Sequence, residues 1–159
     1  MKKVFPILLL IVCSASFAQQ ADPCPLTVAD IESVFGKGFT AGESNKFGDI
    51  SSWKFSNQKY SIQINMNSAY GMKVDDYNKM MSPKTVTWKT VANDPDQARI
   101  EIRDATKDDL AGTPAIVYIR KDKYVRLQVL GNYYDMDNSK KARLLDEMRD
   151  KLVKLKRMP

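Results

Sequence analysis

Side chains that could recognise a partner gather in the stretch 114–131. Apolar and polar residues alternate on both sides of Lys121–Lys123, which predicts two antiparallel strands joined at that turn. One face of this hairpin would be apolar and would carry Val117, Ile119, Val125, Leu127 and Val129. The opposite, solvated face would carry Tyr118, Arg120, Tyr124, Arg126 and Gln128. Because tyrosine and arginine are favoured at interface anchors, we predict that this second set contacts a partner. The alternative is that these residues merely tolerate a solvated strand.

The absence of histidine limits the chemistry of the chain. Histidine is the commonest general base and metal ligand, so Ser-His-Asp, Cys-His and HExxH sites are excluded. A hydrolase that uses only carboxylates remains an alternative. However, the acid pairs Asp75–Asp76 and Asp108–Asp109 are neighbours in sequence, and neighbouring side chains diverge in a helix or a strand. We therefore expect no catalytic residues and no enzyme.

The N-terminus has the pattern of a cleaved signal peptide. Lys2 and Lys3 precede the apolar run 4–12, and Ser16 and Ala18 form a small-x-small cleavage site. We predict a signal peptide over residues 1–18 and a single domain over residues 19–159, located in the periplasm or secreted. The apolar run is shorter than the ~20 residues that a membrane-spanning helix needs.

Cleavage would leave Cys24 without an intramolecular disulfide partner. An odd thiol in an oxidising compartment is either buried and inert or available for an intermolecular bond, so a Cys24-linked dimer is an open alternative. Four methionines could offer the thioethers that Cu(I) favours, namely Met66, Met72, Met80 and Met81. Packing in the core explains these methionines better, since neither a histidine nor a second mature cysteine is present. We expect no metal and no cofactor.

Basic residues concentrate at the C-terminus. Loss of Lys2 and Lys3 lowers the net charge from +6 to +4, and segment 140–159 alone carries an excess of +5. The remainder is close to neutral, which together with export argues against nucleic-acid binding. The basic segment could contact a membrane surface, but a core helix with a solvated outer face is the simpler interpretation.

The first half of the mature chain predicts a helix and a hairpin. Thr27 and Asp30 can form a capping box that begins a helix at Val28, and Gly36 would end it after Phe35. The glycine-, serine- and asparagine-rich segment 36–49 predicts a loop. Alternating residues predict strands over Ser51–Phe55 and Tyr60–Asn67. Helical spacing in Ser68–Met81 leaves a helix open, with Ser82–Pro83 as its end.

The second half completes an α+β domain. Strands are expected over Lys84–Val91 and Ala98–Ile102, before the hairpin, with a polar connection over Ala105–Thr113 between. After the hairpin, a stripe of leucine and methionine predicts a helix over Lys140–Lys156 that packs on the apolar face of the sheet. The expected fold is a two-layer sandwich: a mainly antiparallel sheet of about five or six strands, covered by this long helix and the short N-terminal helix. The strand order is left open.

This order of elements resembles small exported bacterial domains of unknown function with a PsbP-like α/β sandwich fold. The resemblance is carried by the runs 24–32, 35–36, 112–115, 120–123 and 125–127 and by the terminal helix. It implies one antiparallel sheet with helices mainly on one side, and no established catalytic residues. In some such proteins a disulfide joins the first helix to the first aromatic strand, where this chain has Ser51, Ser52 and Trp53 instead of a cysteine.

These observations favour an exported, non-enzymatic protein that binds another protein or a small ligand. The alternatives are an inhibitor or immunity protein against an exported toxin, a carrier of an apolar ligand, and a carboxylate-only hydrolase. The identity of the partner and the oligomeric state are left open.

Overall fold

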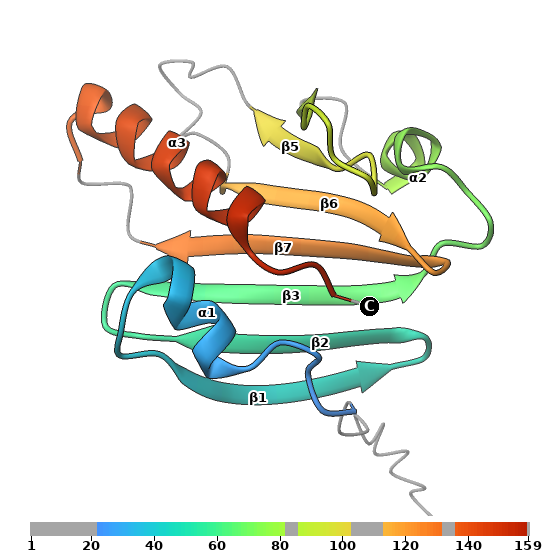
Figure 1. Cartoon of the computed structure of the whole chain (residues 1–159), viewed down its shortest axis with the longest axis horizontal. Helices are drawn as coiled ribbons and strands as arrows, with labels where there is room; N and C mark the ends of the chain where they lie inside the picture. The colour runs from blue at the N-terminus through green and yellow to red at the C-terminus, as the bar shows by residue number, and fades with distance from the viewer. Residues whose placement is uncertain (1–21, 82–85, 103–112, 132–135, 159) are drawn as a thin grey trace, which may run out of the picture.

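The described part of the chain forms one antiparallel sheet and three helices (Figure 1). The computed structural model describes residues 22–81, 86–102, 113–131 and 136–158. The helices are α1 (Val28–Phe35), α2 (Val74–Met81) and α3 (Asn138–Lys154). The strands are β1 (Thr40–Phe47), β2 (Ile50–Ser56), β3 (Tyr60–Ser68), β4 (Thr87–Thr90), β5 (Arg99–Ile102), β6 (Ala115–Arg120) and β7 (Lys123–Gly131). Their order across the sheet is β1-β2-β3-β7-β6-β5-β4.

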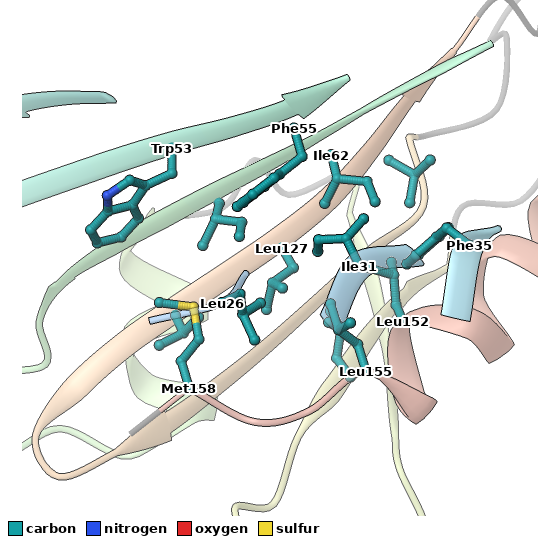
Figure 2. Close-up of a cluster of buried hydrophobic side chains, with 14 of the residues drawn as sticks. Leu26, Ile31, Phe35, Trp53, Phe55, Ile62, Leu127, Leu152, Leu155 and Met158 are labelled. Carbon is teal, nitrogen blue, oxygen red and sulfur yellow. The ribbon is translucent and has the colours of Figure 1, made fainter. Parts of the chain in front are cut away.

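The main core lies between one face of the sheet and helices α1 and α3, which cross the same face in Figure 1. Figure 2 shows how the side chains of this core interdigitate. Leu152 of α3 and its C-cap residue Leu155 belong to the same buried cluster as Leu127 of β7. Burying a leucine contributes about 1.5–3 kcal/mol, so this layer is a major source of stability. The predicted packing of the C-terminal helix on the sheet is confirmed.

Helix α1 has the predicted bounds and cap. The Thr27 hydroxyl accepts a hydrogen bond from the Asp30 amide at 3.1 Å, and the Asp30 carboxylate accepts one from the Thr27 amide at 2.9 Å. Helix α3 begins at Asn138 instead of Lys140, because Asp137 is its N-cap, and it ends at Lys154 instead of Lys156. The undecided segment before Ser82 contains α2, which packs on the opposite face of the sheet from α1 and α3.

Strand β1 was wrongly expected to be a loop. Its sequence is polar because it is an edge strand with little burial on either side. A bulge between Ala41 and Ser44 breaks its register with β2. Gly42 lies within this bulge, where an added Cβ would approach the Lys54 carbonyl oxygen at 3.3 Å. The glycine and bulge that suggested a loop are therefore features of the edge, and the described sheet has seven strands instead of five or six.

The predicted division of the β6–β7 hairpin into two faces is wrong. Its turn has two residues, Lys121 and Asp122, with φ of 48° and 57°. This is the type I′ geometry that matches the twist of a hairpin, whereas a three-residue turn was assumed. Tyr118 therefore pairs with Val125 and points into the main core, and Arg120 lies on that same side. A shift of one residue moves every side chain of a strand to the other face.

Several predictions fall outside the described residues. These are the signal peptide with its cleavage site, the Ser82–Pro83 helix end and the start of the strand predicted from Lys84. Residues 105–112 of the predicted polar connection, which include the Asp108–Asp109 pair, also lie outside the described residues. Among the helices described, none is long and apolar enough to cross a membrane.

The C-terminal segment Leu155–Met158 connects α3 to strand β6 and to the turn between β4 and β5. The Met158 amide donates a hydrogen bond to the Tyr118 hydroxyl at 2.9 Å, and burial raises the pKa of Tyr118 to about 12. Arg157 forms an ion pair with Asp94, whose carboxylate also accepts hydrogen bonds from the amides of Asp96 and Ala98. Burial alone raises the pKa of Asp94, but these hydrogen bonds and the Arg157 charge outweigh burial and lower the pKa below 3.8.

Replacement of Lys121 tests the hairpin geometry. Asparagine tolerates positive φ better than lysine, so Lys121→Asn should raise the free energy of unfolding by about 0.5–1 kcal/mol in urea titrations. Lys121→Val is the matched contrast, because a β-branched residue resists this conformation and should destabilise the protein. If valine is tolerated as well as asparagine, the type I′ turn is incorrect.

Acid titration tests the attachment of the C-terminal segment. Since the folded pKa of Asp94 is lowered, its ionised form stabilises the fold above pH 3.8, and this contribution is lost as the pH falls through the folded pKa. Asp94→Asn should therefore be less stable than the wild type at pH 7, and the difference should shrink as the pH falls below 3.8. A difference that is independent of pH would contradict the ion pair with Arg157.

Candidate functional site

The five residues predicted to share a solvated face do not form one surface. Tyr118 is buried in the main core, and Arg120 lies on the same side of the sheet, 3.8 Å from an Asp96 carboxylate oxygen. Tyr124, Arg126 and Gln128 do lie together, on the second face of the sheet. The candidate site is therefore built around these three residues of β7 and around neighbours that the sequence did not single out.

Helix α2 covers part of this second face. Val74 and Tyr77 of α2 pack against Val117 and Tyr124. The rings of Tyr77 and Tyr124 are stacked with centroids 4.1 Å apart. The Tyr124 hydroxyl donates a hydrogen bond to Asn78 Oδ1 at 2.9 Å, and burial raises the pKa of Tyr124 to about 12. Tyr124 is thus a protonated structural residue at neutral pH.

A chain of polar side chains crosses the sheet beside α2. Arg126 Nη2 donates to Glu101 Oε2 at 2.7 Å, and Arg126 Nε donates to Gln128 Oε1 at 3.2 Å. Gln128 in turn donates to Gln63 Oε1 at 2.8 Å. The Glu101 side chain is only 3% exposed, whereas that of Arg126 is 27% exposed. A buried carboxylate needs a charged partner, so Arg126 neutralises Glu101 while keeping one side open to solvent.

An open cleft of about 690 Å³ lies over the polar chain and next to α2. Its floor consists of Asn65, Asn67, Glu101 and Arg126. Its rim is formed by Asp49 and by four exposed apolar residues, Ile50, Tyr70, Met80 and Met81, which are 43%, 64%, 58% and 59% exposed. Clefts of this size with apolar walls and a few polar groups are typical of ligand sites. We call this site the α2 cleft.

Asn65 is the polar floor residue with unused hydrogen-bonding capacity. It pairs directly with Arg126 in the β3–β7 register, so both side chains point to the same face. The side-chain amide of Asn65 has no hydrogen-bond partner among the described residues. Asn67, by contrast, is bonded to the Tyr77 hydroxyl and to the Ser68 carbonyl. The floor therefore presents one free amide next to a neutralised guanidinium.

Tyr70, at the rim, and the residue after it are each hydrogen-bonded to a carboxylate. The φ of 52° at Tyr70 is rare for a bulky residue. The Tyr70 hydroxyl donates to Asp49 Oδ2 at 2.6 Å, and the following amide, that of Gly71, donates to Asp122 Oδ1 at 2.8 Å. The hydrogen bond from Tyr70 lowers the pKa of Asp49, which is opposite to the direction that a general acid needs. Uncommon backbone conformations held this way concentrate at functional sites.

The geometry bears on the other candidate sites as well. Among the described residues, no group of histidine, cysteine, aspartate or glutamate side chains could hold a metal ion. A second cleft, of about 510 Å³, lies by Cys24, Gly42 and Trp53 at the bulged edge. Cys24 is half-buried, and burial raises its pKa, which makes the reactive thiolate scarcer. Neither cleft lies between α3 and the sheet, where an apolar-ligand carrier was expected to have its cavity.

The sequence missed most of the α2 cleft. Glu101 and Asn65 lie within predicted strands, but nothing in the sequence places β5 and β3 on either side of the β6–β7 hairpin. The tetrad of exposed apolar residues at the rim comes from three separate segments. A signal that could have been used is Glu101 between Ile100 and Ile102, since an acid in an apolar strand needs a basic partner.

A tyrosine substitution tests the support beneath the cleft. Asn78 is buried and its Nδ2 already lacks a partner, so Tyr124→Phe would leave both polar atoms of the amide unsatisfied. We expect a loss of about 1–3 kcal/mol in the free energy of unfolding. The double variant Tyr124→Phe/Asn78→Leu should recover part of this loss because no polar group is then buried alone. Tyr70→Phe, at the exposed rim, is the control and should change stability little.

Comparison with known proteins leaves the family open. No protein-family model matches the chain, and neither a curated protein nor a solved structure matches it. The resemblance to PsbP-like domains accordingly stays a prediction.

Proposed function

We propose that this chain is an exported, non-enzymatic binding protein and that the α2 cleft is its ligand site. The observation that carries the proposal is the combination of an exposed apolar rim with a charge-neutral polar floor. Four large apolar side chains would gain by leaving water, and the Asn65 amide has capacity to bond a ligand. The PsbP-like sandwich belongs to the same proposal and is supported by helices α1 and α3, which pack on one face of the sheet.

The two carboxylates of the cleft support binding better than hydrolysis. Glycoside hydrolysis by carboxylates needs one acid with a raised pKa and one free carboxylate facing it. Here the pKa of Asp49 is lowered by Tyr70, and Glu101 is nearly inaccessible and bonded to Arg126. Both carboxylates act as structural partners of residues that shape the cleft.

Exposed apolar surface beyond the cleft favours a macromolecular partner over a small metabolite. Phe47 is 77% exposed and pairs with the rim residue Ile50 across the β1–β2 turn. A large exposed aromatic next to an apolar rim is typical of an interaction surface. An inhibitor or immunity protein would use such a surface, and would be recognised by a tight complex of fixed stoichiometry.

Fragment mapping by NMR tests the site. Indole, titrated at millimolar concentration, should shift the backbone amide signals of the floor and rim in a saturable manner. Met80→Ser/Met81→Ser should weaken this binding severalfold without changing stability, because both side chains are exposed. Phe47→Ser is the control, because Phe47 is an exposed apolar residue that does not line the cleft, and this variant should bind indole as the wild type does. Shifts centred on Gly42 and Trp53, or none that saturate, would refute the assignment.

A further inference from the structure

We infer that the α2 cleft takes an uncharged segment of a partner polypeptide, with one apolar side chain inside the rim and the adjacent backbone amide on the floor. This inference rests on the proposed function, and it adds the chemical class of the ligand.

The charge of the floor disfavours an anionic ligand. Arg126 is the basic residue of the cleft, and its guanidinium lies 2.7 Å from the Glu101 carboxylate. A ligand carboxylate or phosphate would approach both members of this pair, so attraction to Arg126 is offset by repulsion from Glu101. Asp49 adds a second negative charge at the rim. A neutral acceptor, such as an amide carbonyl, can use the open guanidinium N–H groups without that repulsion.

The hydrogen-bonding groups of the floor match a peptide amide. Asn65 offers both a donor and an acceptor, and it stands opposite Arg126 in the strand register. A backbone amide likewise carries one N–H and one C=O. The carbonyl can accept from Arg126 while the N–H donates to Asn65 Oδ1. An ionised fatty acid has no hydrogen-bond donor and so could not make the bond to Asn65 Oδ1.

The rim suits an apolar side chain of variable shape. Met80 and Met81 end α2 and are flexible and polarisable, which is the property that promiscuous binding surfaces exploit. The Tyr70 hydroxyl is hydrogen-bonded to Asp49, so this part of the rim is more constrained than the two exposed methionines. Phe47 extends the apolar surface past Ile50, further than a single blocked amino acid would reach. This extension favours a polypeptide over a small amide.

The test compares three probes by NMR titration of the whole mature protein. N-acetyl-leucine N-methylamide carries the proposed chemistry, decanoate carries an anionic head, and maltotriose carries hydroxyls. We expect saturable shifts at the floor with a Kd on the order of 1 mM for the leucine amide. Decanoate and maltotriose should bind at least fivefold more weakly. Asn65→Ala should weaken the leucine amide at least fivefold, while Asn45→Ala on the exposed edge strand β1 should leave it unchanged.

A change in ligand preference on neutralisation of Glu101 provides an independent readout. Glu101→Gln leaves Arg126 uncompensated, so decanoate should gain affinity by tenfold or more relative to the leucine amide. Asp146→Asn, which removes the carboxylate of a surface ion pair with Arg149, is the control and should not alter the preference. If Glu101→Gln fails to fold, the Asn65→Ala comparison in the wild-type background decides alone.

The outcomes separate the two proposals. If indole occupies the cleft but the leucine amide does not, the ligand site stands and the peptide inference is overturned. If decanoate or maltotriose binds the wild type more tightly than the leucine amide, the ligand is an anionic amphiphile or a glycan and the inference is also overturned. If no probe saturates, both proposals fail.

Discussion

The register of the β6–β7 hairpin is the constraint on which the rest of the structure depends. Strand β7 lies at the centre of the sheet and pairs with β3 on one side and β6 on the other. Its alternation sends Val125, Leu127 and Val129 into the main core and Tyr124, Arg126 and Gln128 to the second face. One strand therefore anchors α3 and also supplies the floor of the α2 cleft. A slip of one residue would abolish both, because the core would receive an arginine.

The buried Glu101 shows how the two faces are coupled. Its carboxylate binds Arg126 on the second face, and its backbone carbonyl accepts a hydrogen bond from Arg149 Nε of α3 at 3.1 Å. The helix that covers the main core thus holds the strand that carries the acid of the floor. Trp88 of β4 lies under the Arg126 guanidinium, with 5.8 Å from the guanidinium carbon to the ring centroid. The guanidinium is held by an ion pair, an amide and an aromatic ring, which leaves it little freedom to follow an anion away from Glu101.

The features that the sequence predicts correctly are those determined by residues close to one another along the chain. The α1 cap could be recognised because Thr27 and Asp30 are three residues apart, and α3 because its leucine stripe is long. Strand β1 could not, since an edge strand that buries few side chains has no apolar pattern to reveal it. The hairpin faces were misassigned because Lys121 and Asp122 are not the asparagine and glycine that usually mark a type I′ turn. The cleft was missed for a different reason: it needs the strand order, which no local pattern contains.

Rigidity is distributed unevenly around the cleft, and this affects what it can select. The floor is fixed by the sheet, by the Glu101–Arg126 pair and by the stacking of Tyr77 of α2 on Tyr124 of β7. The end of α2 extends Met80 and Met81 into solvent beyond the anchors Val74 and Tyr77. A fixed polar floor discriminates ligands by charge and hydrogen bonding, because misplaced polar groups stay unsatisfied. An adaptable rim discriminates weakly by shape. Such a division would favour one kind of polar group while tolerating many apolar side chains, which is the selectivity that the proposed recognition of a polypeptide segment requires.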